Sequence, residues 1–201
     1  LLLDGDLGRI PKSAKEAIQQ IYDNSERMIL LVNDLLNVSR IDQNKGREEK
    51  VSIDVKKMLS DVVHAMQGEA DRRLVSVVFE KTDISSFIIM APAKHLYEAL
   101  QNLLSNAIKY NKQEGKVTLS LQQHDSHFLI TIADTGIGIP EDAQSKIFSK
   151  FFRASNAVLK ETEGSGLGLS VVKSYLEEAG ASIRFGSEEN KGTTFFIEFS
   201  L

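Results

Sequence analysis

Two glycine-rich stretches and one carboxylate form the pattern in the sequence that most suggests chemistry. The first stretch, "DTGIGIP" (residues 134–140), places Asp134 beside Gly136 and Gly138 at the end of an apolar run. Glycines let a backbone pass close to a flat ligand or adopt positive φ. The carboxylate there can accept a hydrogen bond from an exocyclic amine, such as that of adenine. An ordinary Asp–Gly turn after a strand is the alternative, and this stretch alone leaves both interpretations open.

The second stretch, "GSGLGLS" (residues 164–170), precedes an expected helix. A dinucleotide-binding fingerprint is disfavoured, because its third glycine would fall at Leu169 and because the acidic "VLKETE" before the stretch is not a strand. A Walker loop is disfavoured because no Gly-Lys-Ser/Thr sequence occurs. A glycine-rich helix entry remains, whose free N–H groups can bind phosphate. The polar segment between the two glycine clusters predicts a closing lid.

A polar stripe lies along the segment "HLYEALQNLLSNAIKYN" (residues 95–111), which has the periodicity of a helix. Asn102, Asn106, Lys109 and Tyr110 fall within roughly 100° of arc on such a helix. An asparagine carbonyl suits Mg²⁺, a lysine can neutralise phosphate, and a tyrosine ring can lie against a base. A plain solvated face is the alternative reading of the stripe.

The elements that must position these residues alternate between two periodicities. Helical spacing interleaves with hairpin-connected strands, which predicts an α+β fold, a mixed sheet with helices on one face. The expected helices are 54–72, 93–111 and 166–179, the last ending at Gly180, and the expected strands are 51–54, 75–81, 87–90, 116–123, 127–134, 181–187 and 193–200.

A long bundle-type helix is expected before this fold, over residues 12–43, with Ser13 as its cap. Its apolar and small residues recur in steps of three and four, which favours a four-helix bundle over packing on its own domain. Residues 42–50 read as a linker, and the opening "LLLDGDLG" is similar to the end of an interrupted helix, so we expect a piece of a longer protein. The residues of the seam are Ile18, Ile21, Ser25, Met28, Val32, Leu35 and Ser39, broadened by Leu31, Leu36 and Val38.

The composition narrows the classes of function. A net charge of −4 argues against a nucleic-acid-binding protein. The sequence has no cysteine, which excludes disulfides and thiolate metal sites. No apolar run approaches the roughly 18 residues of a membrane span, so no membrane segment is expected in this chain.

The motifs together closely resemble those of the catalytic and ATP-binding domain of bacterial sensor histidine kinases, in the family's order. The first helix, with "LVNDLLNVSRID" (residues 31–42), is similar to the second helix of that family's dimerisation and histidine-phosphotransfer hairpin. The matching segments are "NLLSNAIKYN" (N box), "DTGIGIP" (first glycine box), "KIFSKFFRA" (F box), "GSGLGLS" (second glycine box) and "KGTTFFIEF" (last strand).

The resemblance implies the ATP-binding fold shared with the gyrase, Hsp90 and MutL ATPases, and ATP and Mg²⁺ as cofactors. It implies a partial hairpin at residues 1–45 and a catalytic domain at 46–201. It also implies roles for individual residues: Asn106 on Mg²⁺; Asn102 and Lys109 near the phosphates; Tyr110 beside adenine; Asp134 on the adenine amine; Gly136, Gly138 and Ile139 in the adenine pocket; Gly164, Ser165, Gly166, Leu167, Gly168 and Leu169 on the phosphate side of the lid; Thr193 supporting the adenine site; and Arg153 reaching the phosphates.

The resemblance further implies two-component signal transduction: a homodimer formed through the bundle, a response-regulator receiver domain as partner, and a cytoplasmic location for this part of a parent that membrane segments could anchor. Related ATPases carry a water-activating glutamate four residues before the Mg²⁺-binding asparagine. That position is Asn102 here, and an amide cannot act as a base, which favours phosphoryl transfer over hydrolysis.

One feature departs from the family. The phosphoacceptor histidine is followed there by an acidic residue, leucine and arginine, and none of His64, His95, His124 and His127 has that context. We therefore expect the acceptor to lie upstream and this chain not to phosphorylate itself. A serine kinase of the same superfamily and a module that only binds a partner are the alternative functions.

Overall fold

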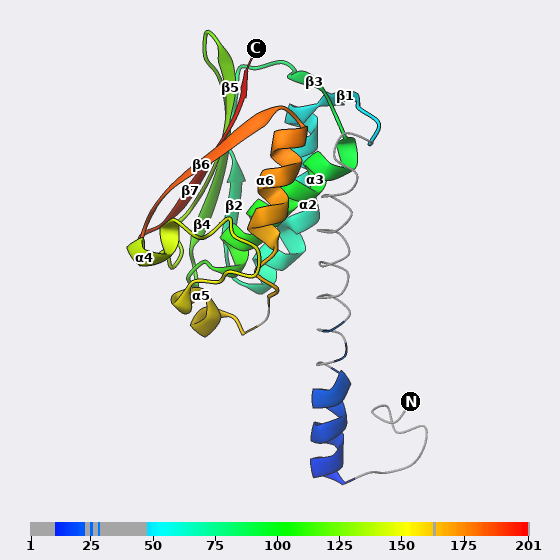
Figure 1. Ribbon diagram of the computed structural model, residues 1–201, viewed down its shortest axis with the longest axis vertical. Coiled ribbons are helices and arrows are strands. Elements are labelled where there is room, and N and C mark those ends of the chain that lie inside the picture. Colours follow the sequence, from blue (N-terminus) through cyan, green and yellow to red (C-terminus); the bar gives the residue numbers. More distant parts are fainter. Residues whose placement is uncertain (1–10, 23–24, 26–27, 29–47, 163, 201) are drawn as a thin grey trace.

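The computed structural model describes residues 11–22, 25, 28, 48–162 and 164–200. Figure 1 shows a sheet with helices packed along it. The elements are β1 (Val51–Asp54), α2 (Val55–Arg72), β2 (Ser76–Phe79), β3 (Ile88–Ala91), α3 (Ala93–Lys109), β4 (Lys116–Gln123), β5 (His127–Asp134), α4 (Glu141–Gln144), α5 (Ser155–Lys160), α6 (Gly168–Glu178), β6 (Ala181–Glu188) and β7 (Gly192–Ser200).

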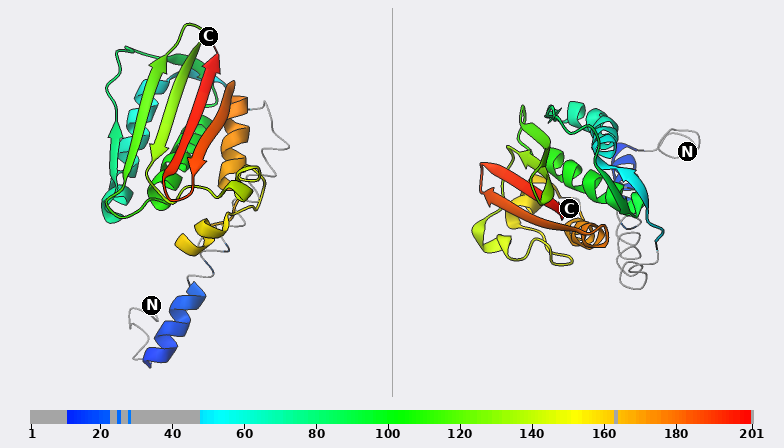
Figure 2. Two further views of the ribbon diagram at one scale, coloured as in Figure 1. Left: turned by 90° about the vertical axis from the view of Figure 1, so that its left-hand side faces the viewer. Right: turned by 90° about the horizontal axis from the view of Figure 1, so that it is seen from above.

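The main sheet has five strands in the order β2-β4-β5-β7-β6. β2 runs parallel to β4, and the other neighbours are antiparallel. Helices α2, α3 and α6 cover one face, and Figure 2 shows the other face without a helix over it. The α+β prediction of a mixed sheet with helices on one face is confirmed.

Strands β1 and β3 pair only with each other, as a separate antiparallel ribbon. The sequence pattern did not reveal this second sheet. β1 runs directly into α2, and the Asp54 carboxylate caps that helix by accepting hydrogen bonds from the backbone N–H groups of Lys56 and Lys57 at 3.0 and 3.3 Å. The junction is therefore fixed by a side-chain cap rather than by the main sheet.

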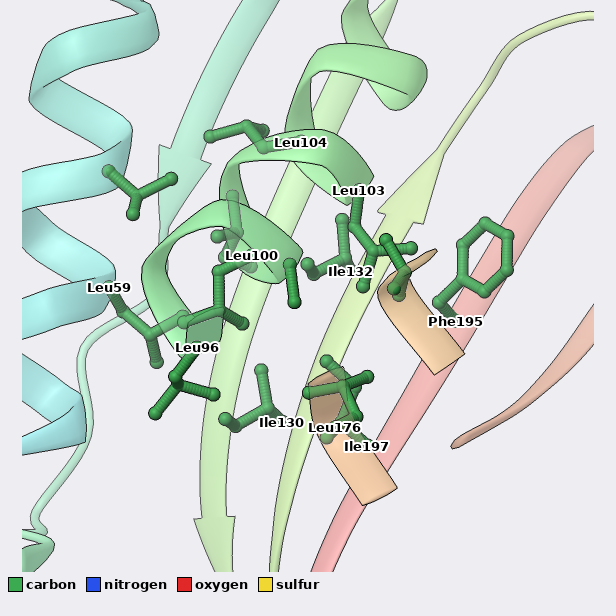
Figure 3. Packing of buried hydrophobic residues seen from close by; sticks show 14 of the residues in the cluster. Leu59, Leu96, Leu100, Leu103, Leu104, Ile130, Ile132, Leu176, Phe195 and Ile197 are labelled. Carbon is green, nitrogen blue, oxygen red and sulfur yellow. The ribbon is translucent and has the colours of Figure 1, made fainter. Parts of the chain in front are cut away.

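Helix α3 lies at the centre of the core. Its apolar face packs against β5 and β4 of the sheet, and α2 and α6 flank it. Figure 3 shows buried residues of α2, α3, α6, β5 and β7 in this cluster. The alternation along β5 puts Phe128, Ile130 and Ile132 inside. The fully buried large side chains are Leu59, Leu96, Leu100, Leu103, Leu104, Ile108, Leu119, Ile130, Ile132, Leu167, Leu176 and Ile197.

The predicted boundaries hold within about two residues for most elements. The helix predicted from residue 166 begins at Gly168, and it ends before Gly180, which adopts φ +83°. The N-terminal helix is present over 12–22 and at 25 and 28, but Ser13 is not its cap: Pro11 accepts the first helical hydrogen bond, from Lys15 N. The rest of that predicted helix, and the linker as far as residue 47, lie outside the described residues.

Two short helices, α4 and α5, were not expected, because four and six residues are too few for a periodic signal. In the part of the chain that the structure describes, no helix combines the length and the hydropathy needed to cross a bilayer.

We predict opposite outcomes for the same substitution at two leucines. Leu100 is 1% exposed and Leu159 is 85% exposed. Leu100→Ala should lower the free energy of unfolding by about 2–5 kcal/mol, because it removes buried methyl groups and leaves a cavity. Leu159→Ala should change it by no more than about 0.5 kcal/mol. Urea denaturation of both variants measures the difference, and equal losses would contradict the described core.

Candidate functional site

A cavity of about 720 Å³ opens between α3, the two glycine stretches and the segment that joins them. All but one of the residues predicted to bind ligand line it. Gly136 is the exception, since it lies buried behind the wall. The predicted residues that line the cavity are Asn102, Asn106, Lys109, Tyr110, Asp134, Gly138, Ile139, Arg153, Gly164, Ser165, Gly166, Leu167, Gly168, Leu169 and Thr193.

Asp134 is the last residue of β5, and the backbone around it holds its side chain. Its Oδ1 accepts hydrogen bonds from Gly136 N at 2.8 Å and from Thr193 N at 3.2 Å. Its Oδ2 accepts no hydrogen bond from the described residues. The carboxylate is thus fixed by one oxygen, while the second remains available to a ligand in the cavity.

Glycines are required where the backbone crowds this carboxylate. A Cβ on Gly136 would lie 2.4 Å from the carbonyl oxygen of Tyr110. Gly192 has φ +119°, and a Cβ there would lie 2.0 Å from the carbonyl oxygen of Asp134. Gly136 therefore serves the site by allowing Asp134 to be held, not by touching a ligand itself.

Burial raises the pKa of Asp134 to about 6, and the hydrogen bonds from Gly136 and Thr193 partly oppose that rise. Desolvation disfavours the charged carboxylate, whereas a donor on the free oxygen would favour it. The site is therefore matched to a ligand that donates a hydrogen bond, such as an amine.

Asn111 ties the end of α3 to the loop that carries Asp134, a role that no sequence motif predicts. It is 3% exposed. Its Nδ2 donates to the carbonyl oxygens of Ala107 and Lys116, and its Oδ1 accepts from Lys112 N and Thr135 Oγ1. An asparagine at a helix end looks like a solvated residue in the sequence, so only the tertiary structure shows that it is a buried brace.

The polar stripe of α3 faces the second glycine stretch. Asn106 Nδ2 donates to Asn102 Oδ1 at 2.9 Å, which leaves Asn106 Oδ1 without a donor among the described residues. A Cβ on Gly168 would lie 2.9 Å from the Asn102 amide, so glycine is what lets α6 begin against α3. Asn106 Oδ1 is a neutral hard ligand of the kind that suits Mg²⁺ bridging phosphates.

The described residues contain no cluster of three or more histidine, cysteine or acidic side chains that could hold a metal by themselves. An ion at Asn106 would therefore need oxygen atoms from a bound phosphate and from water, which is the usual coordination of Mg²⁺ in phosphoryl-transfer sites.

The two basic residues of the site are differently placed. Lys109 Nζ lies 5.8 Å from the centre of the Tyr110 ring, on the stripe itself. Arg153 turns toward backbone carbonyls between the glycine stretches: its guanidinium donates to Ala157, Glu161, Thr162 and Gly164. Arg153 lines the cavity in this structure, with its donors directed at the chain rather than into open space.

The segment between the glycine stretches, residues 141–162, is the predicted lid, and Asn156 on α5 fastens it to the first stretch. Asn156 Nδ2 donates to the carbonyl oxygen of Gly138 at 3.0 Å. Its Oδ1 is buried without a hydrogen-bond partner. The amide orientation is set by the carbonyl, which requires a donor, so the oxygen is left unpaired. No sequence motif indicated this contact.

At the far end of the cavity, Glu98 and Tyr175 join α3 to α6. Burial, and after it Glu98, raises the pKa of Tyr175 to about 12, and the Tyr175 hydroxyl and Glu98 share a hydrogen bond. His95 stacks on Tyr175 with ring centres 4.1 Å apart, and its Nδ1 lies 2.7 Å from Glu178 Oε2. These contacts fix the register of α6 against the helix that carries the asparagines.

Comparison with known families gives a match over residues 91–201 to the model described as histidine kinase-, DNA gyrase B-, and HSP90-like ATPase. The chain is 28% identical to the circadian input-output histidine kinase CikA of Synechococcus elongatus over 98% of its length, and 30% identical to the sensor protein SrrB of Staphylococcus aureus over 94%. It spans 26% and 32% of those two proteins, respectively.

Solved structures share the fold. The catalytic domain of histidine kinase ThkA has a TM-score of 0.64 at 25% identity, covering 76% of this chain and 97% of that domain. Full-length ShkA in complex with AMPPNP has a TM-score of 0.77 at 23% identity, covering 97% of this chain and 40% of ShkA. ThkA in complex with the response regulator TrrA has a TM-score of 0.72 at 22% identity, covering 97% and 53%.

We predict a distinctive pH dependence from the Asp134 pKa. The folded state binds this proton more tightly than the unfolded state, whose carboxyl has the ordinary pKa near 3.8. The protonated group's contribution to stability is therefore complete below about pH 4 and is lost as the pH rises through about 6. A shift of this size corresponds to at most about 3 kcal/mol.

Urea unfolding of the ligand-free chain between pH 4 and 7.5 tests this by comparison with Asp134→Asn, which cannot titrate. As the pH rises, the free energy of unfolding of the unsubstituted chain should fall relative to that of the asparagine variant. A difference that stays constant over this range would contradict the raised pKa.

Proposed function

The chain belongs to the histidine kinase-, DNA gyrase B-, and HSP90-like ATPase family, and we propose that it is the catalytic ATP-binding part of a two-component sensor histidine kinase. It binds Mg-ATP and transfers the γ-phosphoryl group to a histidine outside its own four. The observation that carries this proposal is the backbone-held carboxylate of Asp134, with one oxygen free toward a cavity that ends in the Asn102 and Asn106 amides.

At the adenine end, Asp134 Oδ2 accepts a hydrogen bond from the exocyclic amine. The backbone N–H of Thr193 keeps the carboxylate oriented. Tyr110 and Ile139 supply apolar surface for the base, and Gly138 lets the chain pass close to it. Guanine carries an oxygen where adenine carries the amine, so a carboxylate here selects adenine.

At the phosphate end, Asn106 holds Mg²⁺, and Asn102 and Lys109 contact the phosphates. The stretch from Gly164 to Leu169 surrounds the phosphate chain with backbone N–H groups at the start of α6. Arg153 reaches the phosphates when its carbonyl partners release it. Catalysis is then mainly positioning and charge neutralisation, as in other phosphoryl transfers.

In the reaction, an imidazole nitrogen forms a bond to the γ-phosphorus, and the bond from that phosphorus to the β–γ bridging oxygen breaks. ADP leaves with the electron pair of that bond, and the imidazole releases its N–H proton to solvent water. Among the described residues, the position from which related ATPases activate water carries no base. Asn102 is an amide, and Glu98, one turn earlier, is engaged by Tyr175. This arrangement supports transfer to histidine over hydrolysis.

The same proposal includes a dimer and a partner protein. Residues 1–45 belong to a dimerising helical bundle and residues 46–201 to the catalytic domain, with a response regulator as partner and ATP supplied from the cytoplasm. Among the described residues of the first helix, Ile21, Tyr22 and Met28 are 55–65% exposed, as expected of a face that a further helix would cover. A response-regulator complex of the similar kinase ThkA supports the partner.

Thermal unfolding with and without millimolar Mg-ATP tests the nucleotide site. ATP should raise the melting temperature, because binding to the folded state adds free energy of unfolding. At an ATP concentration one hundred times Kd, the added free energy of unfolding is about 2.7 kcal/mol. Asp134→Asn and Asn106→Ala should remove most of this shift, because they remove the amine acceptor and the metal ligand. Asp142→Asn is a matched control: that carboxylate is exposed on α4 and does not line the cavity, so the full shift should remain. No shift in the unsubstituted chain would favour a module that only binds a partner.

Incubation with γ-labelled ATP tests the assignment of the acceptor. We expect no acid-labile phosphohistidine on this chain, because none of its histidines has an acidic neighbour followed by leucine and arginine. Mass spectrometry under alkaline conditions would locate any label. Phosphate on His64, His95, His124 or His127 would contradict the proposal, and acid-stable phosphoserine would favour a serine kinase.

A further inference from the structure

Arg73 joins two parts of the molecule that lie 88 residues apart in the sequence. It is the C-cap residue of α2, and its Nη1 donates to Glu161 Oε2 at 3.1 Å. Glu161 is the C-cap residue of α5, at the end of the lid. The contact is the described ion pair that connects the lid to α2.

The Arg73 side of this contact is fixed in place. Arg73 Nε donates to Glu69 Oε1 at 2.6 Å, so the guanidinium is already oriented toward the lid. The helix end beneath it is closed by Leu74 at φ +54° and by Val75 N, which donates to the carbonyl oxygen of Ala70 at 2.9 Å. A preorganised guanidinium loses little conformational entropy when it pairs.

The Glu161 side leads directly to the phosphate end of the cavity. The backbone carbonyl of Glu161 accepts from Arg153 Nη2, and Arg153 Nη1 donates to the carbonyl oxygens of Thr162 and Gly164. A continuous set of contacts therefore runs from α2 through Arg73, Glu161 and Arg153 to the second glycine stretch.

We propose that Arg73 and Glu161 form a clasp that positions the lid over the phosphates and must open before nucleotide leaves. They are positioning residues, since neither lines the cavity. Their side chains are 35% and 22% exposed, so water screens the pair less than a fully exposed one yet can still reach it when it opens. The inference rests on the proposed nucleotide site for its effect on release, but the clasp itself does not require a ligand.

The neighbouring Arg72 offers a matched control. It also pairs with Glu69, its side chain is 75% exposed, and it makes no described contact with the lid. Arg72→Gln therefore removes the same charge from the same helix turn without touching Glu161. The experiment compares the full chain carrying Arg73→Gln, Glu161→Gln, both together, and Arg72→Gln.

The first measurement is the dissociation rate of a fluorescent ATP analogue with Mg²⁺, by stopped-flow displacement with unlabelled ATP. Each clasp variant should raise the rate roughly three- to ten-fold, the range for a partly shielded charged hydrogen bond. The double variant should be no faster than the single ones, because both remove one interaction. Adenosine, which has no phosphates, should bind all variants alike, and Arg72→Gln should match the unsubstituted chain.

The second measurement is amide hydrogen exchange over residues 155–162 of the nucleotide-free chain, which should rise several-fold in the clasp variants and not in Arg72→Gln. Unchanged exchange and unchanged dissociation overturn the clasp, as do equal effects of Arg72→Gln or additive effects of the two substitutions. A chain that binds no nucleotide at all overturns the proposed function, and the exchange measurement then still decides the clasp.

Discussion

The site depends on one constraint, namely that a half-buried carboxylate must be held by backbone N–H groups while keeping an oxygen free. Asp134 meets it because β5 pairs with β7, which brings Thr193 N to the same oxygen that Gly136 N contacts from the other side. Burial that raises the pKa of Asp134 is tolerable only with these two donors. The tight backbone at Gly136 and Gly192 follows from the same constraint, since a Cβ at either position would strike a neighbouring carbonyl oxygen.

Helix α3 forms both part of the core and part of the cavity wall, because its two faces differ in polarity. Its leucines fill the core against the sheet, and its amides face the second glycine stretch. Asn111 fixes its last turn to the loop of Asp134, and the contacts of His95 with Glu178 and Tyr175 fix its first turn to α6. The spacing between Asp134 and the amides of Asn102 and Asn106 is therefore set by one rigid element braced at both ends.

Strong periodicity made α3 and the β4–β5 hairpin predictable, because their burial alternates as their sequences do. The residues expected to bind ligand, except Gly136, line one cavity. Other features have no local signal. The pairing of β1 with β3, the buried role of Asn111 and the Asn156 contact depend on partners far away in the chain. Arg153 could be predicted as part of the site, but not its carbonyl partners, because backbone acceptors leave no trace in residue types.

The amide of Asn156 gains one hydrogen bond and leaves one oxygen unpaired where α5 meets the first glycine stretch. Its Nδ2 donates to the carbonyl oxygen of Gly138, and its Oδ1 is buried. A stranded acceptor of this kind costs about 1–3 kcal/mol, comparable to the bond that is gained. The α5 contact with the first glycine stretch is therefore expected to contribute little net stability, and the lid depends more on the carbonyl contacts of Arg153 than on this amide.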